Sequence, residues 1–297
     1  MKHVVVILDG AADNKLSQLN DFTPFEISNS PNLDRMAGEG ICGLAQTIPE
    51  GMDVLTDVAC MSILGYNPAI HYPSRETIEA AANRLQSVKV GSDSSPGNCS
   101  ADMNNPWPFL PGEVSPDLIP IEKALSLRTC MSSGVTLMQG FAALLGIDFL
   151  DIEGIADDLD NDFVAQADAA IESMLSDEFD LAIIHVDAPD KMSHQGNAAD
   201  KIEAIELIDT EVISRLLDSS QRLSKKSGGP GLRILAMPDH YTSVETHRHE
   251  EGAVPFVIWG DSITSNGAKA FSEAECAQTG LSLIPNGHEI MSLLLKK

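Results

Sequence analysis

The fold is decided by the N-terminal stretch Val4-Val5-Val6-Ile7-Leu8-Asp9-Gly10, in which five consecutive apolar residues lead into an aspartate and a glycine. A short apolar run bounded by a turn signal predicts a strand that is buried on both faces. Glycine permits a sharp exit from such a strand. The pattern therefore places the carboxylate of Asp9 at a strand end, where aspartate serves either as a ligand or simply as a turn former.

Three further apolar runs resemble the first one and extend the predicted sheet. They cover residues 181–186, 232–237 and 254–259. Together with residues 3–8 they predict four buried parallel strands. Residues 201–217 repeat isoleucine, valine and leucine at helical spacing, with charges on the other face. Strands alternating with helices predict an α/β fold of three layers, with a mostly parallel sheet covered by helices on both faces.

The functional crevice of such a sheet lies beyond the carboxyl ends of its strands. Acidic and histidine residues follow three of the predicted strands directly, so we expect them to converge there. These residues are Asp9, Asp187, Asp190, Asp239 and His240.

The composition narrows the classes of partner. The 297 residues carry 19 basic and 44 acidic side chains, a formal charge of -25, which disfavours nucleic acid and anionic membranes as partners. A small phosphorylated substrate remains compatible, because bound divalent metals invert the local field. Five scattered cysteines without CxxC spacing favour a reducing compartment. With no signal-peptide core and no apolar membrane span, we expect a cytoplasmic protein. The oligomeric state is left open.

Four clusters of acidic and histidine residues suggest metal binding. The first is Asp9 at the end of its predicted strand. Asp190 and His194 are four residues apart and would share one side of a helical turn, although such pairs are often only surface pairs. His185 lies inside the predicted strand and is interpreted as a core histidine whose ring nitrogens are hydrogen-bonded. Asp187 is interpreted as a partner that orients a ligand. Asp239 and His240 are adjacent ligand types that suit two neighbouring metals.

The fourth cluster contains His247 and His249, of which both, one or neither could be a ligand. Together the clusters offer six or more oxygen and nitrogen ligands and no thiolate. That set suits two divalent ions, with Mn2+ favoured and Zn2+, Mg2+ or Co2+ as alternatives. Paired metals typically serve phosphate ester chemistry.

A nucleophile is predicted at Thr56, where a loop enters a helix in Val54-Leu55-Thr56-Asp57. Backbone N–H groups and the helix dipole favour an anionic phosphate at that point. The alternative is that Thr56 is only a helix cap. Ser62, deeper in the helix among apolar residues, is expected to be structural.

These pieces resemble the alkaline phosphatase superfamily and, within it, the archaeal-type branch of cofactor-independent (2,3-bisphosphoglycerate-independent) phosphoglycerate mutases. The resemblance covers most of the chain apart from roughly residues 86–105. It rests on Val5-Val6-Ile7-Leu8-Asp9-Gly10, Ser30-Pro31-Asn32-Leu33-Asp34, Asp57-Val58-Ala59, Ser62-Ile63-Leu64-Gly65-Tyr66-Asn67-Pro68, the segment from His185 to His194-Gln195-Gly196, Pro238-Asp239-His240, and His249 with Val254-Pro255-Phe256.

The resemblance implies a ligand set and a domain plan. One metal would be held by Asp190, His194 and His249, and the other by Asp9, Thr56, Asp239 and His240. His249 is preferred to His247 because its distance to Val254-Pro255-Phe256 fits the family pattern. Residues 1–85 and 106–297 would form an alkaline-phosphatase-like core, and residues 86–105 a reduced cap.

Arg75 falls where the family carries a Gly-Arg-Gly-Pro run, and it is interpreted either as a contact to substrate phosphate or carboxylate or as a surface ion-pair partner. The chain also departs from the family: Thr56 stands where a serine is usual, and Cys60 where an asparagine is usual.

The implied activity is interconversion of 2- and 3-phosphoglycerate through a phospho-Thr intermediate. A short cap would retain glycerate less well and favour hydrolysis, so a metal-dependent phosphatase or phosphodiesterase is the first alternative. A catalytically degenerate metal-binding homologue is the second.

Overall fold

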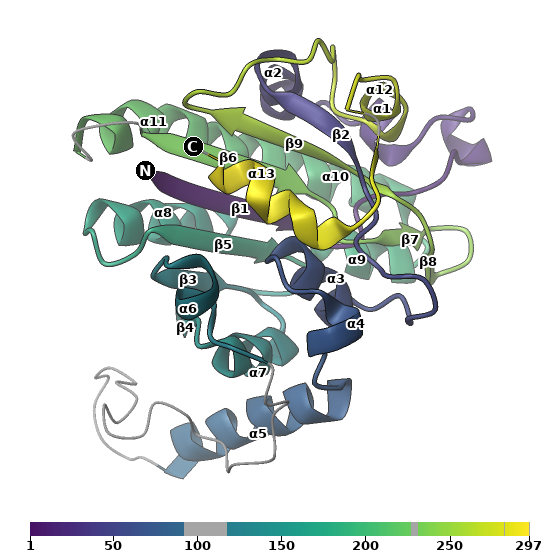
Figure 1. Ribbon diagram of the computed structural model, residues 1–297. Helices are drawn as coiled ribbons and strands as arrows, with labels where there is room; N and C mark the ends of the chain where they lie inside the picture. The colour runs from purple at the N-terminus through teal and green to yellow at the C-terminus, as the bar shows by residue number, and fades with distance from the viewer. Residues whose placement is uncertain (92–117, 227–230, 282, 297) are drawn as a thin grey trace.

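The computed structural model describes residues 1–91, 118–226, 231–281 and 283–296, and it contains an eight-stranded sheet covered by helices on both faces (Figure 1). The strand order is β10-β2-β9-β6-β1-β5-β3-β4. The strands of this sheet are β1 (Lys2–Leu8), β2 (Ile41–Ala45), β3 (Thr129–Ser132), β4 (Asp148–Phe149), β5 (Leu181–Val186), β6 (Leu232–Met237), β9 (Val254–Gly260) and β10 (Leu283–Ile284). A separate hairpin pairs β7 (Tyr241–Ser243) with β8 (Arg248–Glu250).

The central strand β1 sends alternate side chains into two separate hydrophobic cores, as expected from the two-residue period of a strand. Val4, Val6 and Leu8 belong to one core, and Val5 and Ile7 to the other. All five are fully buried. This double burial explains the uninterrupted apolar run of the N-terminal stretch.

One core lies under helices that include the longest continuous helical segment of the described chain. They are α2 (Pro31–Glu39), α8 (Phe163–Leu175), α10 (Ala198–Leu207), the π-helical turn Ile208–Ile213 and α11 (Ser214–Lys226), with α1 (Pro24–Ile27), α12 (Glu273–Ala277) and the 3-10 turn Ser17–Leu19 nearby. The predicted helix of residues 201–217 is thus part of a segment that runs from Ala198 to Lys226.

The opposite core lies under a second set of helices. They are α3 (Thr56–Ile63), α5 (Arg75–Gly91), α6 (Ile121–Leu125), α7 (Thr136–Leu145) and α13 (Ile290–Leu295), with α4 (Pro68–His71) and the 3-10 turn Gly287–Glu289 adjoining, while α9 (Ala188–His194) lies at the strand ends. The first residues of the predicted cap, 86–91, belong to α5, which continues to Gly91. Residues 92–105 of the predicted cap lie outside the described residues.

One predicted strand direction was wrong. β1 pairs in parallel with both β5 and β6, but β9 runs antiparallel to β6 and to β2. A parallel partner requires a crossover connection, usually a helix, whereas the chain between β6 and β9 contains only the short β7–β8 hairpin. The chain therefore turns back at the same edge of the sheet and runs in the opposite direction.

The π-helical turn explains one of the sequence motifs. Asp209 in this turn is fully buried, and its carboxylate accepts hydrogen bonds from the backbone N–H groups of Asn32 (3.2 Å) and Leu33 (2.7 Å). These N–H groups open α2 and have no partner within that helix. The motif Ser30-Pro31-Asn32-Leu33-Asp34 thus has a structural role, because these hydrogen bonds connect the start of α2 to the helical segment from Ala198 to Lys226.

In the described part of the chain, no helix has the length and apolar character needed to span a bilayer. The four described cysteines, Cys42, Cys60, Cys130 and Cys276, are buried free thiols.

Candidate metal centre

Three parallel strands deliver acidic and histidine side chains to one edge of the sheet. Asp9 follows β1, Asp187 and α9 follow β5, and Asp239 and His240 follow β6. Figure 1 shows the carboxyl ends of these strands converging beside α3, α9 and the β7–β8 hairpin. The hairpin contributes the last member, His249 on β8.

The buried half of the site consists of Asp9, Asp239 and His240, which are at most 1% exposed. Nε2 of His240 lies 3.5 Å from Asp9 Oδ1 and 3.2 Å from Asp239 Oδ2. Asp239 Oδ1 accepts hydrogen bonds from the N–H groups of Gly10 and His240. The other oxygen, Asp239 Oδ2, has no hydrogen-bond donor among the described residues, and the same holds for Asp9 Oδ1.

The more open half consists of Asp190, His194 and His249. Nε2 of His194 lies 3.2 Å from Asp190 Oδ2, and Nε2 of His249 lies 3.4 Å from Asp190 Oδ1. The two Nε2 atoms are 3.0 Å apart. The His194 side chain is 41% exposed, so this half of the site faces the solvent from which a substrate would arrive.

The two halves touch each other. Asp190, His240 and His249 offer ligand atoms within 4.8 Å of one another, as do Asp9, Asp239 and His240, and as do Asp9, Asp187 and Asp190. The rings of His240 and His249 have centroids 4.0 Å apart. The cluster is therefore continuous, and His194 joins it through Asp190 and His249.

Thr56 is the first residue of α3, and its hydroxyl faces the cluster. Oγ1 lies 3.4 Å from Asp9 Oδ2 and 3.2 Å from His240 Nε2. The N-cap position belongs to Leu55, and the Thr56 hydroxyl is directed at Asp9 and His240. The alternative interpretation of Thr56 as a helix cap is therefore wrong. Ser62 is buried within the same helix, as expected.

The electrostatics of the cluster favour a cation. Burial and the neighbouring carboxylates of Asp239 and Asp190 raise the pKa of Asp9 well above its usual range, and burial raises the pKa of Asp187 to about 7. Burial opposes ionisation of Asp190 as well, but hydrogen bonds from His194 and His249 hold its pKa well below the usual value. Carboxylates crowded in this way repel one another until positive charge is supplied.

The histidine tautomers are arranged for metal binding. Nδ1 of His194 lies 2.9 Å from the backbone oxygen of His247, and Nδ1 of His249 lies 2.9 Å from that of Val54. A carbonyl oxygen only accepts, so Nδ1 is a donor in each case. Nε2 is directed at the carboxylates and would become the ligand atom when a metal takes the place of the proton that it shares with Asp190. Together with the two donor-free carboxylate oxygens, this arrangement fits divalent ions bound by oxygen and nitrogen ligands.

Other predicted residues lie at the margin of the cluster. His247 is not among the clustered ligand atoms; its Nδ1 pairs with the backbone oxygen of His194 at 3.0 Å, so its ring braces the segment that carries that ligand. Arg75 begins α5, outside the cluster, and its guanidinium lies 3.7 Å from the carboxylate of Asp57, the residue after Thr56.

Sequence reasoning placed three contributors too far from the site or overlooked them. His185 is buried, but its Nε2 is 3.2 Å from Asp9 Oδ2 and its Nδ1 is 3.0 Å from Ser133 Oγ, so it is more than a core histidine. Asp187 joins a ligand cluster directly. Thr242 contacts Asp190 and His240, and no spacing in the sequence signals that contact.

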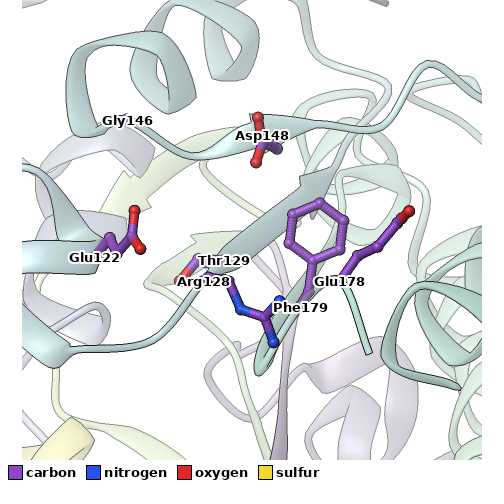
Figure 2. A pocket seen from close by; sticks show the side chains of 7 residues that line it. All are labelled: Glu122, Arg128, Thr129, Gly146, Asp148, Glu178 and Phe179. Carbon is purple, nitrogen blue, oxygen red and sulfur yellow. The ribbon is translucent and has the colours of Figure 1, made fainter. Parts of the chain in front are cut away.

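A separate hollow lies at the opposite edge of the sheet, near the amino end of β3. Figure 2 shows the side chains of Glu122, Asp148, Glu178 and Phe179 around Arg128. The Arg128 guanidinium is already paired with both carboxylate oxygens of Asp180, at 3.0 Å each. The residues that line this hollow include no histidine, in contrast to the cluster at the carboxyl edge.

Comparison with known proteins identifies the family and the fold. The family model described as the Metalloenzyme superfamily matches residues 1–297. A 2,3-bisphosphoglycerate-independent phosphoglycerate mutase of Methanothrix thermoacetophila is 26% identical over 398 aligned residues, covering 99% of this chain and 100% of the relative. A second mutase of that name, from Methanothermobacter thermautotrophicus, is 25% identical over 404 residues, covering 99% of this chain and 97% of the relative.

Solved structures share the fold. A protein from Pyrococcus horikoshii superposes with a TM-score of 0.76 at 23% identity, covering 99% of this chain and 95% of that chain. A cofactor-independent phosphoglycerate mutase from Thermoplasma acidophilum gives 0.69 at 17% identity, covering 100% and 99%. Alkaline phosphatase from the Antarctic bacterium TAB5 gives 0.53 at 14% identity, covering 99% and 96%. The predicted alkaline-phosphatase-like architecture is confirmed.

Proposed function

We propose that this chain, which belongs to the Metalloenzyme superfamily, transfers the phosphoryl group of a small phosphate ester through the hydroxyl of Thr56. The observation that carries the proposal is the position of Thr56 Oγ1, within 3.4 Å of both Asp9 and His240, at the N-terminus of α3. A hydroxyl beside clustered carboxylates and imidazoles, at the end of a helix that favours anions, suits attack on phosphorus.

The proposed site would hold two divalent ions. Asp190, His194 and His249 would hold one, and Asp9, Thr56, Asp239 and His240 the other, with Asp187 close to both. The described clusters offer carboxylate and imidazole donors and no thiolate, a set compatible with Mn2+, the ion we propose, and with Zn2+, Mg2+ or Co2+ as alternatives. When bound, such ions neutralise the charge of the phosphoryl oxygens and lower the pKa of the attacking hydroxyl.

The chain itself positions the reaction. Thr56 Oγ1 donates to Asp9 Oδ2, which would receive the proton as the Oγ1–phosphorus bond forms. The phosphorus–oxygen bond of the ester breaks in the same step, and the departing oxygen takes up a proton from water. The first hydrogen bond of α3 runs from Ala59 N to Leu55 O, so the N–H groups of Asp57 and Val58 point out of the helix end without an acceptor among the described residues. These groups would hold the phosphoryl oxygens.

Arg75 is the proposed cationic contact to the substrate. Its guanidinium lies 3.7 Å from Asp57 Oδ1, while Tyr72 donates to Asp57 Oδ2 at 2.6 Å. Asp57 is fully buried and so holds both partners beside Thr56. The Arg75 side chain is 43% exposed, which leaves it accessible to an anionic substrate group.

The more specific proposal is phosphoglycerate mutase activity, which the names of the relatives support. Hydrolysis is the competing form, and a specific observation favours it. The relatives align over 398 to 404 residues, whereas this chain has 297, so about 100 aligned positions have no counterpart here. If the missing part is the cap over the substrate, water reaches the phosphothreonine more easily.

The test combines activity with trapping of the phosphorylated enzyme. Metal-stripped protein is loaded with Mn2+, Zn2+ or Mg2+ and incubated with 2- and 3-phosphoglycerate and with a generic phosphate ester. Interconversion of the phosphoglycerates supports the mutase, and free phosphate as the sole product supports the hydrolase. Acid quenching with radiolabelled substrate should show phosphate on Thr56.

Two variants make the test specific. Thr56→Val should abolish both turnover and labelling, whereas Ser62→Ala, in the same helix but not facing the cluster, should retain both. Failure of the wild-type protein to bind two equivalents of metal, together with no activity on any ester, would show a degenerate homologue instead.

A further inference from the structure

A buried hydroxyl that belongs to neither predicted ligand set contacts both halves of the metal centre. Thr242 on β7 is fully buried, two residues after His240. Its hydroxyl oxygen lies 2.6 Å from Asp190 Oδ1, in the open half, and 3.1 Å from His240 Nδ1, in the buried half. One hydroxyl thus contacts a proposed ligand of each ion.

The direction of these hydrogen bonds follows from counting protons. An ionised carboxylate only accepts, so the single proton of the Thr242 hydroxyl goes to Asp190. The hydroxyl can then only accept from His240, which places a proton on Nδ1 of that ring. The lone pair of His240 is consequently on Nε2, the atom that faces Asp9 and Asp239.

Thr242 differs in kind from the groups that orient the other two histidines. His194 and His249 are oriented by backbone oxygens, which no substitution removes. Among the three imidazoles proposed as ligands, only His240 has a side chain as hydrogen-bond partner of its Nδ1, beside a backbone hydrogen bond to Tyr241. The same side chain also orients the one carboxylate that His194 and His249 share.

The backbone of Thr242 is held rigidly. Its N–H donates to Ala12 O at 3.1 Å, and its carbonyl accepts from Lys201 Nζ at 2.7 Å. The fully buried Lys201 ammonium also donates to Ala12 O and pairs with Asp13 at 3.0 Å. Thr242 is therefore tied to the segment that leaves β1 immediately after Asp9.

We propose that Thr242 is a positioning residue that couples the two metal sites, by fixing the tautomer of His240 and the orientation of Asp190 with a single hydroxyl. This inference rests on the proposed two-metal function. It does not depend on which phosphate ester is the substrate, because the Thr242 side chain is buried and directed at the ligands.

The test measures metal binding, not turnover. Calorimetric titration of metal-stripped protein with Mn2+ compares wild type, Thr242→Val and Thr242→Ser. Valine keeps the shape and removes the hydroxyl, and serine keeps the hydroxyl. We expect Thr242→Val to weaken Mn2+ binding at both sites by about 10- to 100-fold, the range typical of groups that orient metal ligands, and Thr242→Ser to restore most of it.

A matched control is Thr129→Val. Thr129 is also buried, and its hydroxyl donates to Leu127 O at 3.1 Å, at the amino end of β3 away from the cluster. This variant should bind Mn2+ like wild type. Thermal unfolding of each variant without metal shows whether the fold is retained, and Thr242→Ala replaces Thr242→Val if the valine variant does not fold.

The outcomes separate the two proposals. Unchanged affinity in Thr242→Val, or weakening at one site only, overturns the coupling role and leaves the proposed function standing. Binding of none of the four ions Mn2+, Zn2+, Mg2+ and Co2+ by wild type overturns the proposed function itself. A loss in Thr242→Val that Thr242→Ser reverses supports the coupling role, because a merely structural threonine would not require its hydroxyl for metal affinity.

Discussion

Substituting Gly10 by alanine should damage the site through a single added carbon. Gly10 follows Asp9 with φ +60°, a left-handed conformation. A Cβ there would lie 2.4 Å from Asp190 Oδ1, 2.5 Å from Thr242 Oγ1 and 2.7 Å from Asp190 Cβ. Ordinary contacts begin near 3.4 Å, so Asp190 would have to move by about 1 Å. The Asp190 to Thr242 hydrogen bond cannot survive such a shift unchanged.

The magnitude has two parts. A residue with a side chain in a left-handed conformation costs roughly 1–2 kcal/mol. Overpacking a buried site adds about 1–3 kcal/mol. Gly10→Ala should therefore lower the free energy of unfolding of the metal-free protein by about 2–5 kcal/mol.

Gly267→Ala supplies the matched control. Gly267 also has a positive φ, +89°, but a Cβ there would meet nothing within 4 Å. It should show only the backbone cost of roughly 1–2 kcal/mol. Urea denaturation of the two variants in chelator, followed by calorimetric titration with Mn2+, isolates the effect of the clash. Equal destabilisation by Gly10→Ala and Gly267→Ala, with metal binding retained in both, would refute the close packing described here.

The remaining predictions concern residues other than the proposed metal ligands. Burial lowers the pKa of His3 to about 4, so the folded protein keeps this ring neutral where the unfolded chain binds a proton. The neutral His3 ring therefore contributes to the free energy of unfolding above about pH 6.5, and this contribution falls by up to about 3 kcal/mol as the pH drops toward 4. His3→Asn should flatten this part of the curve when urea unfolding is compared at pH 4.5 and 7; parallel curves would argue against it. Asp209→Ala leaves the buried N–H groups of Asn32 and Leu33 without acceptors and should cost about 2–4 kcal/mol in urea unfolding. Asp168→Ala, which removes an exposed ion pair with Arg215, should change stability by less than about 1 kcal/mol, and a similar loss in both variants would contradict the capping role of Asp209. Gly196→Ala should weaken Mn2+ binding, because a Cβ there would lie 2.4 Å from the His247 ring that braces His194; unchanged titration curves would count against that bracing.

The sequence by itself determined the layer plan and the edge of the sheet where the site lies. A strand buried on both faces and an amphipathic helix can each be predicted from the local spacing of apolar residues, because that spacing does not depend on distant parts of the chain. Because parallel strands present their carboxyl ends together, Asp9, Asp190 and Asp239 could be assigned to one crevice from their places after three runs. Thr56 followed from the same logic at a helix start.

Only the tertiary structure decided which groups pair across that crevice. The direction of β9 depends on the route of the chain between two strands, which periodicity does not encode. The contact between His185 and Asp9 joins neighbouring strands across 176 positions, and Thr242 reaches Asp190 across 52. Hydrogen bonds with these geometries depend on distances of a few tenths of an ångström, set by the packing of β1, β5, β6 and β7 against one another.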